Sequence, residues 1–455
     1  MKTRMNFKDE FYQKLKLLVL PIAIQNFMLA LVSATDAIML GWIDQTSLSA
    51  VSLAGQVQFV LSLFISGIAA GAGIMAAQYW GKQDAASIEK VIPIALRTNL
   101  LFSGLFTILA GFCPEMLMRI FTNDAALVAS GSQYLRAVAL SYVLCGISQV
   151  YLILLKNTGH AAVSSRISST AVVLNIILNA ILIYGLCGAP ALGIRGAAYA
   201  TVAARVVELI WAYLETKKPE RVRILWNRLF SSAGKILSED FWRYTLPVLA
   251  ASLVWGIAYV LYSVIMGHMG SDAVAANSIT SIAKSLLSCL IRGVSGGAGV
   301  LIGNLLGANE LEKAREYGGR LSHLSIAIGI VTGGLLVLIS PAIVHFAPLS
   351  DTAAEYLQYM LLFCGLNLMA QSVNTTVLDG IFCAGGDAKF DMQGNIGAMW
   401  CFSVPLGFLA AFWLKLPVMV VYCIVNLDEI VKLPAVYHHY KKYIWVRNIT
   451  RDVED

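Results

Sequence analysis

The sequence predicts an all-α integral membrane protein of about twelve transmembrane helices, arranged as two repeated six-helix lobes. Of its 455 residues, 58% are hydrophobic and only 13% are charged, whereas soluble globular domains are about 25% charged. Apolar stretches of about 20 residues, enough to cross a hydrocarbon core of about 30 Å, recur along the whole chain. The two halves of the chain also align with each other. The bilayer is therefore the expected solvent and partner, and a large soluble domain is excluded.

The apolar stretches and the segments between them define the expected organisation. We expect an N-lobe over 1–215, a basic cytoplasmic linker over 216–240, a C-lobe over 241–440 and a cytoplasmic tail over 441–455. The second and eighth spans are long and rich in glycine, which favours tilted or bent helices packed closely on their neighbours. The expected spans are 15–42, 50–80, 92–114, 131–155, 163–187, 194–215, 241–267, 275–304, 320–345, 355–383, 393–413 and 416–437.

Lys and Arg residues are distributed unevenly between the segments that connect the spans. With a cytoplasmic N-terminus, most of the 33 fall on the cytoplasmic face, and only Arg119, Arg136, Arg195 and Lys415 fall outside. Such a bias sets membrane orientation. It predicts a multi-pass protein of the inner (plasma) membrane with both termini in the cytoplasm. Attraction of the basic face to anionic lipid explains the net charge of +6, so no nucleic-acid partner is expected.

The two halves align without a gap over about 60 residues at an offset of 226 positions. Leu20-Pro21 matches Leu246-Pro247, and Gly71-Ala72-Gly73 matches Gly297-Ala298-Gly299. An even number of spans in each half makes the repeats parallel. In transporters built this way, substrate and ion sites lie near the membrane midplane at the repeat interface. The repeat therefore favours a secondary transporter, although a duplication can also simply build a larger scaffold.

Five short motifs follow one another in a pattern shared with a known family. They are residues 35–41 (TDAIMLG), 76–81 (AAQYWG), 175–179 (NIILN), 193–201 (GIRGAAYAT) and 384–390 (AGGDAKF). Together they resemble the bacterial branch of the multidrug and toxic compound extrusion (MATE) family. The resemblance implies a V-shaped pair of lobes that exports small organic cations or other amphiphiles by alternating access. It also implies that inward flow of H⁺ or Na⁺ drives export, without catalytic residues or an organic cofactor.

Asp36 is the main candidate for coupling the ion to the cargo. A carboxylate inside an apolar helix is costly and marks a functional site by default. Burial favours the neutral acid and a nearby cation favours the ionised one, so a proton and a cationic substrate would compete for the same oxygens. The family's first-helix Asp falls at this place, and Pro21 stands at its helix-bending proline. The alternative is that Asp36, about 30 Å of helix beyond Lys16, only reaches the membrane interface.

Asn175 and Asn179 are four residues apart and share one face of the fifth span. Their amides are candidates to hydrogen-bond Asp36 or to bind Na⁺ through oxygen. Members of the family often have Asp at the place of Asn179, so this chain lacks the second acid, and we favour H⁺ over Na⁺. The alternative role of the two Asn residues is hydrogen bonding between helices. Thr201 is a further candidate carried over from the same resemblance.

Charged residues also lie within the spans of the second half. Asn374 stands where some family members have Asp, and the seventh span has no acid, which argues against a sodium site of that kind. Lys284, Arg292 and Asp379 are nevertheless expected within spans, where unpaired charges are costly. We expect Arg292 to pair with Asp379 or Glu429. These groups either line the substrate cavity or form a structural charge network.

Three further features bear on the site. Tyr142 is a candidate to line the cavity, because aromatic faces attract organic cations. Arg205 and Glu208, three residues apart on the sixth span, are expected to form an ion pair within one helix. The eight Cys residues form no CxxC pair and the six His residues are scattered, so no metal site is expected.

The leading interpretation is a secondary active antiporter that functions as a monomer. The alternatives are a flippase for a lipid-linked precursor, a dedicated metabolite exporter and an integral-membrane enzyme. A flippase needs several cavity cations, for which only Arg205, Lys284 and Arg292 are candidates. An enzyme needs clustered His, Asp or Cys residues at interfacial depth, and the linker 216–240 has no such cluster.

Overall fold

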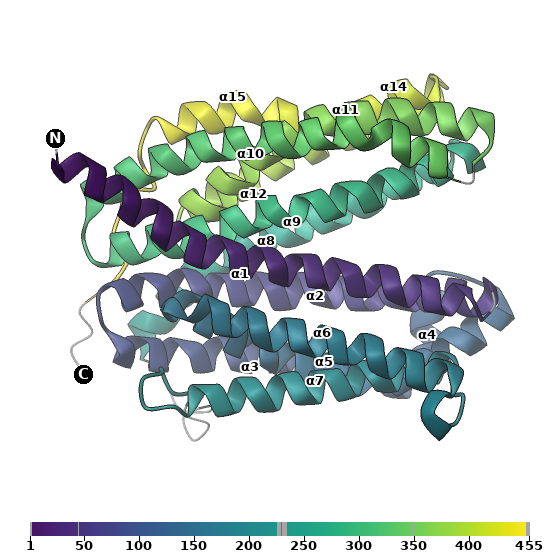
Figure 1. Ribbon diagram of the computed structural model, residues 1–455, viewed down its shortest axis with the longest axis horizontal. Helices are drawn as coiled ribbons and strands as arrows, with labels where there is room; N and C mark the ends of the chain where they lie inside the picture. The colour runs from purple at the N-terminus through teal and green to yellow at the C-terminus, as the bar shows by residue number, and fades with distance from the viewer. Residues whose placement is uncertain (1, 44, 225–228, 230–233, 348, 452–455) are drawn as a thin grey trace. The chain divides into compact units, whose positions relative to one another are not determined.

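The structure is a computed structural model that describes residues 2–43, 45–224, 229, 234–347 and 349–451. Over these residues the regular elements are all helices, with no strand (Figure 1). The expected all-α class is therefore confirmed. In chain order the elements are α1 (Lys2–Gly41), α2 (Gln45–Gly81), α3 (Ala85–Phe112), α4 (Pro114–Arg119), α5 (Ala125–Leu155), η1 (Lys156–His160), α6 (Ala161–Tyr184), η2 (Leu186–Gly188), α7 (Ile194–Thr216), α8 (Lys235–Gly267), α9 (Ser271–Gly307), α10 (Leu311–Phe346), α11 (Asp351–Thr375), η4 (Thr376–Phe382), α12 (Ala388–Asn395), η5 (Ile396–Ser403), α13 (Val404–Phe408), η6 (Leu409–Trp413), α14 (Val418–Val425) and α15 (Asp428–Tyr440).

In the described part of the chain, ten helical stretches are long and apolar enough to cross a membrane. One of them, Ala125–Tyr184, has 60 residues and contains both α5 and α6. These two helices meet at Gly159, whose φ of 81° breaks the helical path; glycine tolerates such a conformation because it has no Cβ. The short helices α14 and α15 follow one another over residues 418–440. Counting α5 and α6 separately and α14 with α15 as one more crossing, the helices agree with the expected twelve spans.

Residues with clear local preferences fix several helix ends. Asp124 caps the start of α5, where its carboxylate accepts hydrogen bonds from the backbone N–H groups of Ala126 and Leu127 at 2.8 and 3.2 Å. Such caps satisfy N–H groups that have no partner within the helix. Gly185, with φ of 74°, ends α6 in the left-handed conformation. Proline occurs inside both α1 and α8, as Pro21 and Pro247.

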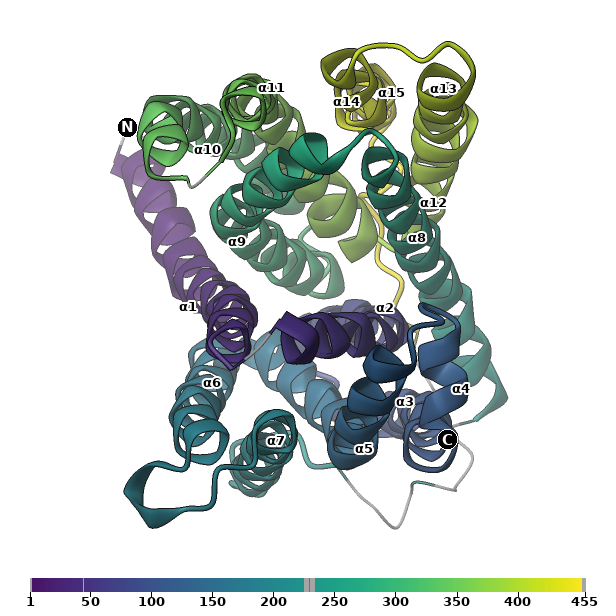
Figure 2. The same ribbon diagram turned by 90° about the vertical axis from the view of Figure 1, so that its right-hand side faces the viewer.

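The chain divides into two compact units, and the division falls within α1 and α8. One unit contains Met1–Asn26 and Ala250–Asp452, and we call it the second-half unit; the other contains Phe27–Leu249, and we call it the first-half unit. In the first-half unit α5 lies beside α2, α3 and α7, and in the second-half unit α11 lies beside α9 and α10 (Figure 2). Grouping by contacts thus places the first part of α1 in the second-half unit and the first part of α8 in the first-half unit. The lobe boundaries expected from the sequence therefore stay a prediction.

In the second-half unit, the first part of α1 packs on glycines of α9. A Cβ atom placed on Gly293 would lie 2.9 Å from the Cα atom of Ala23, and one on Gly297 would lie 2.8 Å from Cγ2 of Val19. Contacts this short leave no room for a side chain. Glycine is therefore required at both positions for the two helices to approach.

In the first-half unit, α8 packs on glycines of α2 in the same way. A Cβ atom on Gly67 would lie 2.9 Å from the Cα atom of Leu249, and one on Gly71 would lie 2.7 Å from that of Thr245. These four residues are the counterparts, at the offset of 226, of the four that join α1 to α9. The sequence repeat is thus also a repeat of contacts, and the close packing expected of the two glycine-rich spans is confirmed.

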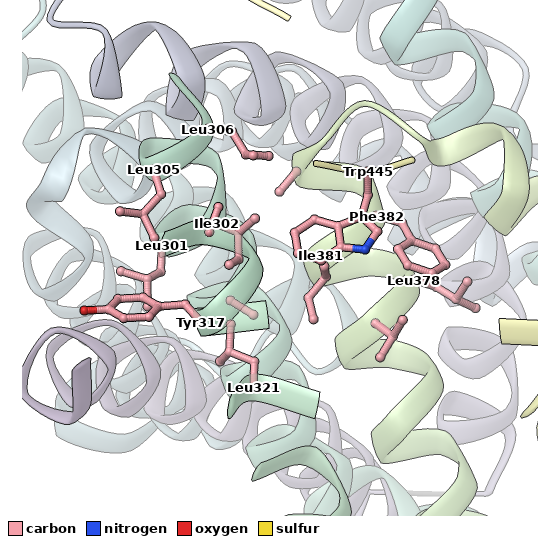
Figure 3. Close-up of a cluster of buried hydrophobic side chains, with 14 of the residues drawn as sticks. Leu301, Ile302, Leu305, Leu306, Tyr317, Leu321, Leu378, Ile381, Phe382 and Trp445 are labelled. Carbon is pink, nitrogen blue, oxygen red and sulfur yellow. The ribbon is translucent and has the colours of Figure 1, made fainter. Parts of the chain in front are cut away.

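Trp445, which follows α15, completes a hydrophobic core in the second-half unit (Figure 3). The Trp445 side chain is fully buried at 0% exposure, and its ring packs on Gly318 of α10. Arg447 donates hydrogen bonds to the carbonyl oxygens of Gly385 and Gly386 at 2.7 and 2.5 Å. The described part of the segment expected as a tail, 441–455, is therefore packed against the helices; its cytoplasmic location stays a prediction.

Candidate ion-coupling site

Asp36 lies in the last two turns of α1, where it meets α6. Its Oδ1 atom accepts a hydrogen bond of 2.5 Å from the Nδ2 atom of Asn179. Asp36 is partly buried, and the Asn179 side chain is fully buried at 0% exposure. The expected hydrogen bond between Asp36 and one of the two Asn residues is therefore confirmed. The carboxylate is directed toward the interior of the first-half unit.

A chain of polar side chains continues from Asn179 across α6 to α7. Asn179 Nδ2 also lies 3.2 Å from Oδ1 of Asn175, whose own Nδ2 donates to Thr201 Oγ1 at 3.3 Å. Thr201 Oγ1 in turn donates to the carbonyl oxygen of Ala197 at 3.0 Å. Asn175 therefore contacts Thr201 rather than Asp36. The four side chains of Asp36, Asn179, Asn175 and Thr201 form one hydrogen-bonded chain that we call the Asp36 relay.

The Asp36 relay contains one acid and otherwise neutral groups. Asn179 Oδ1 is buried and has no hydrogen-bond partner among the described residues. A buried acceptor of this kind lacks the hydrogen bond that normally offsets its desolvation. The relay can thus accept one more donor, which a protonated carboxyl group or a cationic N–H group would supply.

A second link holds α6 against the end of α1. The hydroxyl group of Tyr184, at the end of α6, donates to the backbone carbonyl oxygen of Met39 at 2.7 Å. Met39 lies three residues after Asp36, and Tyr184 lies five residues after Asn179. The two helices are therefore joined at two neighbouring points. Tyr184 was not among the expected site residues, because a tyrosine near the end of a span is typical of any membrane interface.

Two tyrosines of α5 lie in the hydrophobic cluster beside the relay. Tyr134 and Tyr142 pack with Leu40 of α1 and Ile183 of α6, and Tyr134 is within electrostatic range of Asp36. The Tyr142 hydroxyl is buried without a hydrogen-bond partner in the described chain. Tyr134 was not among the expected site residues. Its spacing of eight residues from Tyr142, two turns along one helix face, is the signal that would have indicated it.

Arg205 and Glu208 form the expected ion pair on α7. Arg205 Nη1 lies 2.7 Å from Glu208 Oε2, and Ser148 of α5 donates to Glu208 Oε1 at 2.8 Å. The prediction of a pair within one helix is confirmed. Because Glu208 is buried, this neutralised pair ties α7 to α5.

Glu429 of the second half pairs with a residue that was not expected. Glu429 Oε1 lies 3.1 Å from Nζ of Lys432 on the same helix. Among the described residues Arg292 forms no close ion pair, but it lies within electrostatic range of Asp379, so the expected pairing of Arg292 with Asp379 or Glu429 stays a prediction. The spacing of three residues on α15 brings Lys432 to Glu429, whereas the expected partner would have to come from α9. Lys432, which falls within the expected span 416–437, is only 6% exposed.

The remaining candidates for the substrate cavity divide between the two units. Lys284 donates from Nζ to Asn367 Oδ1 at 2.9 Å, and Asn374 donates from Nδ2 to Glu429 Oε2 at 2.8 Å. Arg292 and Asp379 are exposed. Their roles toward cargo stay predictions. The candidates in the second-half unit are Pro21, Lys284, Arg292, Asn374 and Asp379, and those in the first-half unit are Tyr142 and Thr201.

The chain is similar to curated bacterial transporters over nearly its whole length. It is 21% identical to the uncharacterized transporter YisQ of Bacillus subtilis, covering 94% of this chain and 93% of that one. It is 21% identical to the probable multidrug resistance protein YoeA of the same organism, covering 99% and 98%. The probable multidrug resistance protein NorM of Agrobacterium fabrum is 24% identical, covering 84% and 83%.

Solved structures and a family model agree with this similarity. A MOP superfamily transporter from Pyrococcus furiosus superposes with a TM-score of 0.85 at 19% identity, covering 95% of each chain. A MATE crystal structure in complex with MaL6 gives 0.85 at 20% identity, covering 95% and 96%. These two show the fold alone. The MatE family model matches residues 21–181 and again 247–409, and the two matches begin at the prolines paired by the internal repeat. The chain therefore belongs to the MATE family of membrane transporters.

Proposed function

We propose that this protein is a secondary active antiporter that exports small cationic or amphiphilic organic compounds in exchange for inward H⁺. Family membership and relatives named as probable multidrug resistance proteins support an efflux function. The observation that carries the coupling is the hydrogen bond between Asp36 and the buried Asn179, which ties the acid to a relay of neutral groups. Asp36 is thus the group whose charge can change.

The composition of the Asp36 relay favours H⁺ as the coupling ion. With Asp36 ionised, the relay has one negative charge and attracts a cationic cargo. With Asp36 protonated, the charge is gone and the carboxyl group becomes a hydrogen-bond donor. One carboxylate that is occupied by a proton or by cargo, but not by both, produces exchange when access alternates between the two sides. Sodium would need several oxygen ligands, and the one charged ligand that the relay offers is the Asp36 carboxylate.

The setting of this cycle is the inner (plasma) membrane, with both termini in the cytoplasm. The bias of Lys and Arg toward one face supports this orientation. Because both halves of the repeat are in one chain, a monomer suffices for alternating access.

The test is transport by purified protein in proteoliposomes with an imposed gradient. A pH gradient is expected to drive accumulation of a fluorescent organic cation such as ethidium, and Asp36→Asn is expected to abolish it while the protein still inserts and elutes as a single species. Asp124→Asn is the matched control, because Asp124 is an exposed acid and Asn also caps helices well. Full transport by Asp36→Asn would contradict the proposed role. Transport driven by Na⁺ with the pH clamped would contradict H⁺ coupling.

The flippase alternative has less support. Of its three candidate cations, Arg205 is neutralised by Glu208 and Lys284 is hydrogen-bonded to Asn367. Lys284 and Arg292 are then the two cations left for an anionic headgroup, and recognition of pyrophosphate generally uses several cations or bidentate guanidinium groups.

A further inference from the structure

A second buried group of ionisable residues lies in the second-half unit and has no part in the proposed exchange. It brings together α11, α12 and α15. Glu429 and Lys432 form its central ion pair, and the acids Asp391 and Asp428 are only 7% and 6% exposed. We call this group the α15 cluster, and its members are Asn374, Asp391, Asn395, Asp428, Glu429 and Lys432.

Lys432 connects the members of the α15 cluster. Its Nζ atom lies 3.1 Å from Glu429 Oε1, 3.8 Å from Asp428 Oδ2 and 3.2 Å from Asn395 Oδ1. Asn395 Nδ2 then donates to Asp391 Oδ1 at 3.2 Å. One ammonium group therefore serves three carboxylates, one of them through a neutral amide.

The charges of the α15 cluster do not balance when every acid is ionised. Three carboxylates against Lys432 give a formal charge of −2. The charged groups within electrostatic range on neighbouring helices are Asp379 of η4 and Lys284 and Arg292 of α9, and the hydroxyl of Tyr262 on α8 also faces the acids. Including them still leaves a charge of −1. Uncompensated buried charge is strongly unfavourable, and binding one proton would remove it.

The hydrogen bonds of the α15 cluster show the same deficit independently of charge. Asn374 is only 2% exposed, and its Nδ2 atom holds Glu429 Oε2 at 2.8 Å, so its side chain is directed into the cluster. Its Oδ1 atom is nevertheless buried without any donor among the described residues. Ionised carboxylates only accept hydrogen bonds, whereas a protonated carboxyl group donates one. The cluster therefore has too few donors as well as too few positive charges.

The contacts distinguish the acid that stays ionised from those that take up a proton. Glu429 has the shortest contact with Lys432 and two hydrogen bonds from Asn374, one to its carboxylate and one to its backbone oxygen. Asp428 has the longer contact of 3.8 Å with Lys432 and a backbone hydrogen bond from Glu429, and the one side-chain donor to Asp391 among the described residues is the neutral amide of Asn395. We propose that the α15 cluster is a second proton-binding site, in which Asp391 and Asp428 share one exchangeable proton while Glu429 and Lys432 remain an ion pair.

Proton binding at the α15 cluster does not depend on the role of Asp36, so it is tested in protein that cannot use Asp36. Purified full-length Asp36→Asn protein is brought from about pH 8 to about pH 6, above the range in which exposed carboxyl groups titrate. The infrared band of protonated carboxyl groups is recorded together with the number of protons taken up. We expect the band to grow and one proton per chain to bind in addition to those taken up by the six His residues, which titrate in the same range.

The decisive variant adds Asp391→Asn and Asp428→Asn to Asp36→Asn, since these isosteric changes keep the hydrogen-bonding shape. The band and the additional proton should both disappear, and they should persist when Asp351→Asn, a change of an exposed acid on α11, is added instead. Persistence of the band in the decisive variant would overturn the proposal, and so would absence of the band and of the additional proton in Asp36→Asn itself. Suppression of the band when Na⁺ replaces K⁺ would identify a sodium site instead. Because no step measures transport, failure of the Asp36 exchange cannot be mistaken for failure here.

Discussion

The Asp36 relay and the α15 cluster bury acids in opposite ways. The relay joins a single carboxylate to two amides and a hydroxyl group, and among its described residues there is no fixed cation to compete with an incoming one. The cluster holds a lysine within 3.1 Å of one of its three acids. A neutral surrounding leaves an acid free to exchange its counter-ion. A fixed ion pair instead holds one acid in its ionised form, so that only the remaining acids can exchange a proton.

The backbone that carries these two groups is nevertheless repeated. Gly67 and Gly71 of α2 receive α8 as Gly293 and Gly297 of α9 receive α1. The duplication has therefore kept the small residues that control helix approach, while the polar residues differ between the halves. A glycine in such a contact cannot be replaced without cost, because a side chain would collide with the backbone of the neighbouring helix. Polar side chains that bond only to one another can be replaced as a set.

The largest expected effect is a loss of stability when the fixed ion pair of the α15 cluster is broken. Lys432→Met should destabilise the protein by about 3–5 kcal/mol, because it leaves Glu429 buried without its counter-ion. Thermal unfolding in detergent measures the effect. Lys389→Met, which removes an exposed lysine of α12, should change the stability little. Replacing both partners, Lys432→Met with Glu429→Leu, should recover part of the loss; if the single variant is as stable as the parent, the ion pair is not structural.

A smaller effect tests the repeated frame. Gly71→Ala should cost about 1–3 kcal/mol, since the added Cβ would meet the backbone of Thr245 on α8 and overpack the contact. Gly55→Ala on the same helix is the control, because a Cβ there meets nothing within 4 Å. The difference in unfolding midpoint between the two variants isolates the helix contact. Equal midpoints would mean that α2 and α8 adjust at no cost.

The smallest expected effect is the loss of one neutral hydrogen bond from the Asp36 relay. Thr201→Val removes the acceptor of Asn175 and should cost about 1 kcal/mol, the usual contribution of one neutral hydrogen bond. Thr98→Val, whose hydroxyl group bonds only within its own helix, should cost less. Transport driven by a pH gradient should continue in both, because the bond between Asn179 and Asp36 remains. Complete loss of transport in Thr201→Val alone would show that Thr201 has a direct part in coupling.

Local patterns in the sequence were sufficient for much of the fold and part of the site. The apolar runs predicted the spans, the spacing of three predicted the pair of Arg205 and Glu208, and the spacing of four put Asn175 and Asn179 on one face. Contacts between helices could not be predicted from such local patterns. The burial of Lys432 against Asn395 of α12 is one such contact, because the residues are 37 positions apart in the sequence. Tyr134 and Tyr184 resemble ordinary membrane tyrosines until their neighbours are known.

The sequence by itself therefore determined that this chain is a duplicated bundle of membrane helices with an acid in its first span, because hydropathy, glycine spacing and repeats are local properties. Only the tertiary structure decided which side chain meets that acid, that Asn374 and Asn395 of other helices bind the pair of Glu429 and Lys432, and that Trp445 is buried in a core. The physical reason is that hydrogen bonds and ion pairs act over about 3 Å, and their partners here are up to 143 positions apart in the sequence.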